Sequence, residues 1–219
     1  MSIGPLSLWV SASALVLLAV TTPSPADERP QPVMLAEETL LSYLPASEEP
    51  RVEARLDVDF TGDGLRDSAF VLRGNETRVL KVLVGYATDV DVDYNPAGEM
   101  AMDISPLGTA ALSAKNGVLI VEDLAGGTSA FQSLYRFRYV AGAGRMRLIG
   151  DDVSYYSRTN QHGSMSISTN RLTGARITTE SELDGETYVD RPAKRSKVAT
   201  RPIYMEDAPS PAQTLGFDD

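Results

Sequence analysis

The sequence contains no cysteine, and it has only one histidine and one tryptophan in 219 residues. Without cysteine the chain has no disulfide, no thiolate nucleophile and no lipobox residue to carry a lipid anchor. The formal net charge of −10 disfavours a nucleic-acid partner, because phosphate binding requires a basic surface. The same charge favours steering toward a basic protein, although it also serves plain solubility.

Catalytic motifs are also scarce. The single histidine, His162, lies in the turn-like segment Asn160–Gly163, and no Gly-x-Ser-x-Gly elbow is present to expose a nucleophilic serine. A zinc site would need carboxylates in place of the usual histidines. Paired carboxylates for glycoside hydrolysis have no sequence signature, so that chemistry stays open. Of the classes considered, an enzyme is the least favoured, and we expect a protein that is not an enzyme.

The N-terminal segment has the features of a secretory signal. Leu8–Val20 is apolar apart from two serines, and it is too short to span a membrane, which takes roughly 20 apolar residues. Ser24-Pro25-Ala26 fits a cleavage site. No Lys or Arg precedes the apolar run, so a membrane anchor or a misassigned start is the alternative. The pattern predicts a signal peptide over residues 1–26 and a soluble periplasmic protein with no membrane span after cleavage.

After the signal, the pattern changes from helical to β. Residues 27–50 form a predicted leader with one short helix over Met34–Leu44, which Pro45 ends. Residues 51–203 form a predicted β domain, because short runs rich in Val, Ile, Tyr, Phe and Thr are separated by Gly, Asn and Asp. The predicted strands are Val52–Val58, Ser68–Arg73, Val79–Tyr86, Val118–Glu122, Leu134–Val140, Met146–Ile149, Ser164–Ser168 and Arg176–Thr179.

Many short strands with almost no helix favour an all-β fold, either β-propeller-like or a closed antiparallel arrangement. Tyr135-Arg136-Phe137-Arg138-Tyr139 predicts a strand with one apolar and one basic face, and Ala141–Gly144 predicts the turn of a hairpin. Asp89–Gly108 is interpreted as a long surface connection. Arg191–Arg201 is interpreted as a solvated last strand or tail. Residues 204–219 are predicted to form a disordered acidic tail.

The clearest chemical motif is Asp59–Asp67, which reads Asp-Phe-Thr-Gly-Asp-Gly-Leu-Arg-Asp. Calcium takes about six to eight oxygen ligands, and a glycine at the sixth loop position permits the sharp turn. The predicted ligands are the side chains of Asp59, Thr61, Asp63 and Asp67 and the carbonyl of Leu65. Strand-like flanks, and Phe70 at the twelfth position, indicate a strand–loop–strand site rather than a helix–loop–helix one. The alternative is an Asp/Gly-rich turn that binds nothing.

A second candidate site is the segment Glu122–Phe131 between two predicted strands. It combines a flexible pair of glycines, two hydroxyl side chains and an aromatic end, which suits insertion into the cleft of a partner. The predicted partner-binding residues are Gly126, Gly127, Thr128, Ser129 and Phe131. The alternative is an ordinary hairpin loop whose Phe131 returns to the core.

The order of these features resembles exported bacterial β-propeller proteins of the VCBS and FG-GAP type. Asp59–Asp67 is similar to their Asp-x-Asn-x-Asp-Gly-x-x-Asp loop, with Thr61 in place of the Asn. The other segments that carry the resemblance are Asn116–Ile120, Gly126–Ser129, Tyr135–Tyr139, Leu148–Gly150 and Asn170–Gly174.

The resemblance has functional implications, because that family includes periplasmic immunity proteins similar to the inhibitors of invertebrate-type lysozyme. It implies that this chain blocks a lysozyme-like peptidoglycan hydrolase, itself basic, by inserting Gly126–Phe131 into the active-site cleft. Thr128 and Ser129 would hydrogen-bond a catalytic carboxylate there, and Ca²⁺ would stabilise the fold. The alternative is a calcium-binding interaction or scaffold module of the cell envelope with no inhibitory activity.

Overall fold

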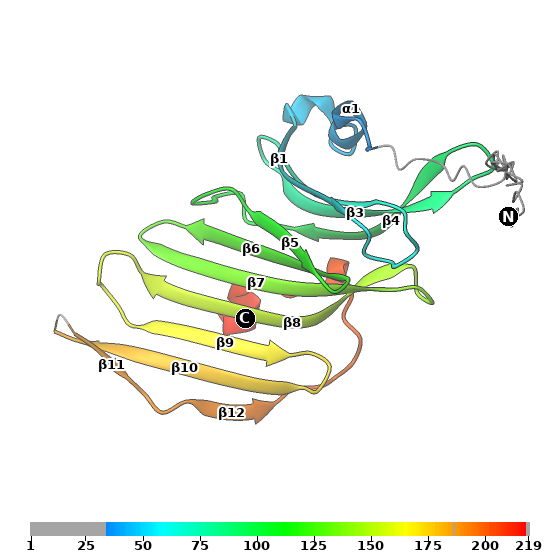
Figure 1. Ribbon diagram of the computed structural model, residues 1–219. Coiled ribbons are helices and arrows are strands. Elements are labelled where there is room, and N and C mark those ends of the chain that lie inside the picture. Colours follow the sequence, from blue (N-terminus) through cyan, green and yellow to red (C-terminus); the bar gives the residue numbers. More distant parts are fainter. Residues whose placement is uncertain (1–33, 186, 218–219) are drawn as a thin grey trace, which may run out of the picture. The chain divides into compact units, whose positions relative to one another are not determined.

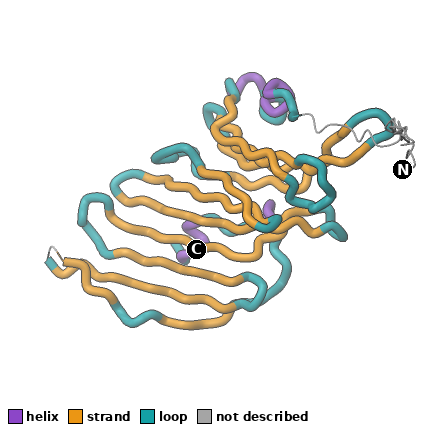
Figure 2. The backbone as a smooth tube through the Cα atoms, in the orientation of Figure 1, coloured by secondary structure: helices purple, strands orange, loops and turns teal. Residues whose placement is uncertain are grey.

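The structure is a computed structural model that describes residues 34–185 and 187–217. The described residues form two antiparallel sheets and two short α-helices (Figure 1; Figure 2), which confirms the all-β class. The predicted signal peptide lies outside the described residues, as does the start of the leader. In the described ranges, none of the helices has the length and apolar character that crossing a membrane requires.

The smaller sheet has the strand order β1-β2-β3-β4, and the larger sheet has the order β11-β10-β9-β8-β7-β6-β5, with β12 also paired to β10. Among the described strands, the two end strands of a sheet do not pair with each other, so no closed barrel is seen. The four-stranded and eight-stranded sheets also do not form the repeated blades of a propeller. The strands are β1 Arg51–Val58, β2 Asp67–Arg73, β3 Arg78–Ala87, β4 Val92–Ala101, β5 Ala111–Lys115, β6 Val118–Gly126, β7 Ser129–Val140, β8 Arg145–Ser157, β9 Ser164–Asn170, β10 Ala175–Asp184, β11 Thr187–Asp190 and β12 Lys194–Lys197.

Each predicted strand lies within an observed one, but β4, β5 and β11 were not predicted. The region predicted as a long surface connection contains β4, which pairs with β3 alone among the strands that the structure describes. An edge strand tolerates Pro and Gly because one side of it needs no ladder hydrogen bonds. Asn95, Pro96 and Gly98 occupy β4 for this reason, and they are also what made the segment look like a loop.

Strands β2 and β3 are buried on both faces. On one face, Phe70 and Leu72 pack with Leu40 of helix α1 (Glu37–Leu41). On the other face, Val71 and Leu80 join the core between the two sheets. A strand covered on both sides has no polar face, which explains its continuous apolar run. The short N-terminal helix is thereby confirmed, although it is shorter than the predicted Met34–Leu44.

Strand β7 has the two-faced character that its sequence predicts. Tyr135 and Phe137 are 3% and 0% exposed and point into the core between the sheets. Arg138, on the opposite face, is exposed, and Arg136 is partly exposed and pairs with Asp152 at 2.7 Å. The predicted Ala141–Gly144 turn follows, and β8 returns from Arg145.

The segment predicted as a disordered tail is ordered over most of its length, which corrects that prediction. It contains a short 3₁₀ turn at Met205–Asp207 and helix α2 at Pro211–Leu215. Ser210 caps α2 in a capping box with Gln213, an arrangement that satisfies backbone N–H groups at the helix start. Met205 is fully buried and joins the main core. Apolar anchoring therefore outweighs the acidic composition.

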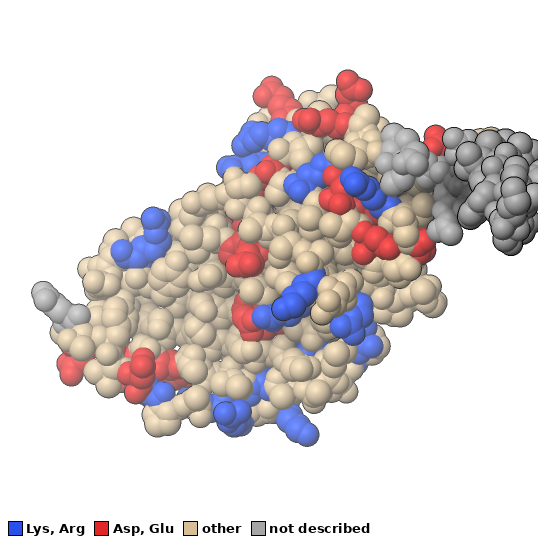
Figure 3. Space-filling model, viewed as in Figure 1, with Lys and Arg blue, Asp and Glu red and all other residues tan. Residues whose placement is uncertain are grey.

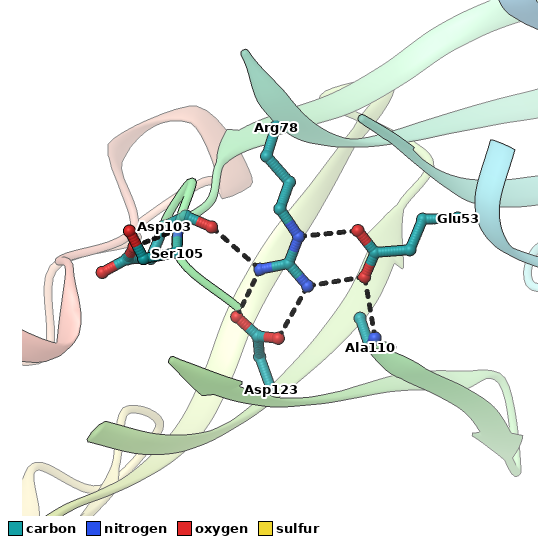
Figure 4. A network of polar contacts seen from close by, with 6 residues as sticks. All are labelled: Glu53, Arg78, Asp103, Ser105, Ala110 and Asp123. Atoms are coloured by element: carbon teal, nitrogen blue, oxygen red, sulfur yellow. Dashed lines mark hydrogen bonds and ion pairs between the residues drawn. The ribbon is translucent and has the colours of Figure 1, made fainter. Parts of the chain in front are cut away.

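A buried guanidinium joins the two sheets (Figure 4). Arg78 of β3 donates to both carboxylate oxygens of Glu53 in β1 and of Asp123 in β6, at 2.7–2.8 Å. It also donates to the carbonyl of Asp103, and Glu53 accepts from the backbone N–H of Ala110. Burial would lower the pKa of Arg78, but the two carboxylates outweigh it and raise that pKa.

Candidate functional site

The predicted calcium loop connects β1 to β2 and is held by its own carboxylates. Asp59 accepts hydrogen bonds from the hydroxyl of Thr61 at 3.1 Å and from the backbone N–H groups of Gly62 at 2.6 Å and Gly64 at 2.9 Å. Asp63 accepts from the N–H of Leu65 at 2.8 Å. Both glycines have positive φ, a backbone conformation that strongly favours glycine. The loop is therefore tightly turned around Asp59.

Asp67, the predicted ninth loop position, is the first residue of β2 and is fully buried. One of its oxygens accepts from the N–H groups of Phe60 at 2.6 Å and Thr61 at 3.1 Å, and the other accepts from Gly85 of β3 at 3.0 Å. Burial raises the pKa of Asp67 to about 6 against the lowering effect of these hydrogen bonds, and the nearby charge of Asp59 adds to the rise. This carboxylate clamps the loop to the sheet.

The donor chemistry of the loop fits calcium, since carboxylate, hydroxyl and carbonyl oxygens are the ligands this ion prefers. The mutual repulsion of Asp59 and Asp67 also fits, because a cation between them would remove it. In this structure, however, the carboxylate oxygens of the loop accept hydrogen bonds from backbone N–H groups. In the described part of the chain, no three acidic or histidine side chains form a group that could hold a metal. The residues that would hold calcium are those predicted from the sequence. The same loop geometry is also found in a stable turn that binds no metal.

The second predicted site is a tight hairpin rather than a ten-residue loop. Strand β6 extends to Gly126 and β7 begins at Ser129, so only Gly127 and Thr128 connect them. Gly126 has a φ of 111°, and a Cβ at this position would lie 2.5 Å from the carbonyl oxygen of Ser129. Gly127 and Thr128 are exposed at the tip. The flexible glycine pair predicted from the sequence is in fact a defined turn.

A residue just beyond the end of β8 supports this tip. The backbone N–H of Arg158 donates to the carbonyl of Thr128 at 2.8 Å, and its guanidinium donates to the carbonyl of Gly127 at 3.1 Å. Arg158 itself is exposed. Nothing in the sequence marks this arginine as part of the site, because it lies thirty residues beyond the turn and is brought there by the pairing of β7 with β8.

The only histidine of the chain also contacts the tip. The Oγ of Ser129 lies 2.8 Å from Nε2 of His162, and Nδ1 of the same ring lies 2.6 Å from the carbonyl oxygen of Gly163. The ring stacks on Tyr155 with centroids 4.8 Å apart and planes 6° apart. Tyr188 of β11 donates to the carbonyl of His162. The turn-like segment predicted around His162 thus holds the ring in one orientation.

Phe131 packs within the fold instead of standing free as an anchor. Its ring lies 5.1 Å from that of Tyr155 and 6.1 Å from that of Phe217. It also packs against a small core formed by Val153, Ile167 and Leu215. This arrangement corresponds to the alternative in which Phe131 returns to the core. It leaves Gly127 and Thr128 as the exposed part of the segment, with Ser129 half-buried beside His162.

Comparison with known proteins adds no family: no family model, no curated protein and no solved structure matches this chain. The site therefore rests on its own geometry. It consists of the calcium-type loop between β1 and β2, and of the tip residues Gly127, Thr128 and Ser129 supported by Arg158 and His162.

Proposed function

We propose that the protein is an exported, periplasmic inhibitor of a lysozyme-like peptidoglycan hydrolase, of the kind that protects a cell as an immunity protein. In this proposal, the β6–β7 tip enters the active-site cleft of the hydrolase. The observation that carries the proposal is the form of this tip. A two-residue turn, Gly127–Thr128, is exposed at the end of a long hairpin and is held by hydrogen bonds to Arg158 and to the carbonyl of Ser129.

A fixed turn suits insertion because little conformational entropy is lost when it binds. Lysozyme-like hydrolases work with two carboxyl groups across a cleft. The hydroxyls of Thr128 and Ser129 are the groups of this tip that can hydrogen-bond such carboxyls. Phe131 supports the tip from the core and does not contact the target in this proposal.

Charge favours a basic target. The net charge of −10 would accelerate the approach of a basic hydrolase, and the effect would weaken as salt is added. On the face drawn in Figure 3, acidic and basic side chains are interspersed rather than sorted by sign. The charge therefore contributes to long-range attraction, while the tip provides the specific contacts.

The role of calcium in the proposal is structural. Asp59, Thr61, Asp63, Asp67 and the carbonyl of Leu65 would hold the ion between β1 and β2, where it would neutralise two mutually repelling carboxylates. The same observation favours the second candidate, a calcium-binding envelope interaction or scaffold module without inhibitory activity. The two candidates share the loop and differ in what the β6–β7 tip does.

The test is an inhibition assay with purified lysozyme-type hydrolases acting on peptidoglycan, with calcium present. Thr128→Trp places a bulky ring at the tip and is expected to reduce inhibition at least tenfold. Ala143→Trp is the matched control, since it alters the exposed turn at the opposite end of β7. Full hydrolase activity at saturating wild-type protein, for every lysozyme type tested, would reject the inhibitor and favour the scaffold module. Equal loss of inhibition in both variants would place the contact away from the tip.

A further inference from the structure

The hydrogen bonds of His162 determine which of its two ring nitrogens carries the hydrogen when the ring is neutral. The carbonyl oxygen of Gly163, 2.6 Å from Nδ1, can only accept a hydrogen bond. The neutral ring must therefore carry its hydrogen on Nδ1, which leaves Nε2 as an acceptor. Stacking on Tyr155 keeps the ring in this orientation.

The protonation state of the ring determines whether the Ser129 hydroxyl donates or accepts the hydrogen bond between them. With Nε2 as an acceptor, the Ser129 hydroxyl must donate its only hydrogen to the ring across the 2.8 Å contact. The serine then offers only lone pairs to anything that approaches the tip. Lone pairs repel a carboxylate, so Ser129 cannot donate a hydrogen bond to one while His162 is neutral.

Protonation of His162 reverses this polarity. The imidazolium ring carries hydrogens on both nitrogens, so Nδ1 still donates to Gly163 while Nε2 now donates to the oxygen of Ser129. The hydroxyl hydrogen of Ser129 is released and can donate outward. The backbone does not need to move, because both contacts keep their distances and only the direction of one hydrogen bond changes.

The charged groups around the ring come from several elements. Arg158 follows β8, and its guanidinium bonds to Gly127 at the tip. Glu182 and Asp184 of β10 line an open groove of about 580 Å³ beside the ring, and Glu182 is paired with Arg191. These acids line the groove and not the tip. At the tip itself, Arg158 contributes a positive charge.

We infer that the tip of the β6–β7 hairpin is a carboxylate-binding site that forms when His162 is protonated, with Ser129, the imidazolium ring and Arg158 as its cationic and hydrogen-donating groups. The inference rests on the proposed function only in naming the hydrolase as the source of the carboxylate. A carboxylate pairs well with these groups, because hydrogen bonds in which a partner is ionised are about twice as strong as neutral ones. The site offers nothing comparable to a neutral ligand.

The inference is tested without any hydrolase, with acetate as the probe. Backbone amide signals of Gly127, Thr128 and Ser129 are followed by NMR during titration with sodium acetate, and sodium chloride at equal ionic strength serves as the reference. The titrations are run at about pH 5.5 and about pH 8, on either side of the range in which histidines ordinarily titrate. We expect acetate to bind about tenfold more tightly at the lower pH.

Three variants separate the parts of the site. His162→Phe keeps a ring on Tyr155 but has no nitrogen, and it should remove the pH dependence. Ser129→Ala should weaken acetate binding at the lower pH at least fivefold. Ser166→Ala, on β9 of the same sheet, is the matched control and should behave like wild type. Melting temperatures verify that each variant folds.

Equal acetate binding at both pH values in the wild type overturns the inference. So does a pH dependence that survives in His162→Phe. The outcome is separable from that of the proposed function. Acid-dependent acetate binding without inhibition of any hydrolase would reject the inhibitor and leave the carboxylate site standing. Inhibition through the tip with no acid-dependent acetate binding would reject this inference alone.

Discussion

Arg78 of β3 and Asp123 of β6 form a two-pronged ion pair that links the two sheets, with both donor–acceptor distances at 2.8 Å. The arginine side chain is 0% exposed and that of Asp123 is 9% exposed. Glu53 of β1 completes the pairing from the other side. The group therefore combines one buried cation with two carboxylates that depend on it.

Replacing Arg78 with methionine should destabilise the fold strongly, because it leaves the carboxylates of Glu53 and Asp123 buried without their cation. Breaking a buried pair in this way costs about 3–5 kcal/mol. The exposed pair Arg191–Glu182 provides the control, and Arg191→Ala should cost no more than about 1 kcal/mol. Urea denaturation of the two variants measures the difference in free energy of unfolding. Similar small losses in both would show that the buried pair does not hold the sheets together.

The raised pKa of Asp67 predicts an unusual pH dependence when calcium is removed. Its unfolded pKa is near 3.8 and its folded pKa is about 6, so in this range the folded state binds more protons than the unfolded state. With chelator present, the free energy of unfolding should therefore fall as the pH rises through this window, by up to roughly 3 kcal/mol.

Calcium should reverse that loss, because a bound cation favours the ionised carboxylate. Melting temperatures are compared between about pH 4 and about pH 7, with calcium and with chelator. Asp67→Asn is the control, since it cannot ionise and should lose both the pH effect and the calcium effect. If chelator and calcium give the same melting curve for the wild type at about pH 7, the loop between β1 and β2 is a turn without metal.

A third prediction concerns Gly85, which packs against the loop that Asp67 ends. A Cβ at Gly85 would lie 2.7 Å from the backbone carbonyl oxygen of Arg66, and the N–H of Gly85 donates to Asp67. Gly85→Ala should push the loop away from β3 and destabilise the protein by about 1–3 kcal/mol. Gly108→Ala is the control, because a Cβ there meets nothing within 4 Å. Thermal melts that place both variants at the same temperature would contradict the close packing.

The sequence predicted those parts of the fold whose signals are local. Alternation in Tyr135–Tyr139 and the continuous run at Ala69–Leu72 depend on neighbouring positions, and both strands were placed correctly. The edge strand β4 was missed because Pro96 and Gly98 are permitted by pairing on one side only, which is a property of the sheet and not of the segment.

The candidate site divides in the same way. The order of oxygen-bearing residues in Asp59–Asp67 can be read from the sequence. The hydrogen bond of Asp67 to β3, however, depends on a residue eighteen positions further along the chain. The contact of Ser129 with His162 joins residues thirty-three positions apart. Neither contact has a local signal, and both depend on strand pairing.

The last prediction tests the ordered C-terminal segment, whose helix α2 had a legible signal in Ser210-Pro211-Ala212-Gln213, a capping box with proline at its start. Met205 is 0% exposed and packs in the core between the sheets, close to Gly98 and Met146. Met205→Ala should therefore cost about 2–5 kcal/mol of stability through the cavity it leaves.

Glu206→Ala is the neighbouring control, because Glu206 is exposed and forms an ion pair with the partly exposed Arg145. Such a surface pair contributes about 0–1 kcal/mol. Chemical denaturation compares the two variants under one set of conditions. A Met205→Ala protein as stable as Glu206→Ala would mean that the segment after β12 does not contribute to the core. A large difference would establish that an acidic, proline-containing terminus is held in place by one buried methionine and the capped helix that follows it.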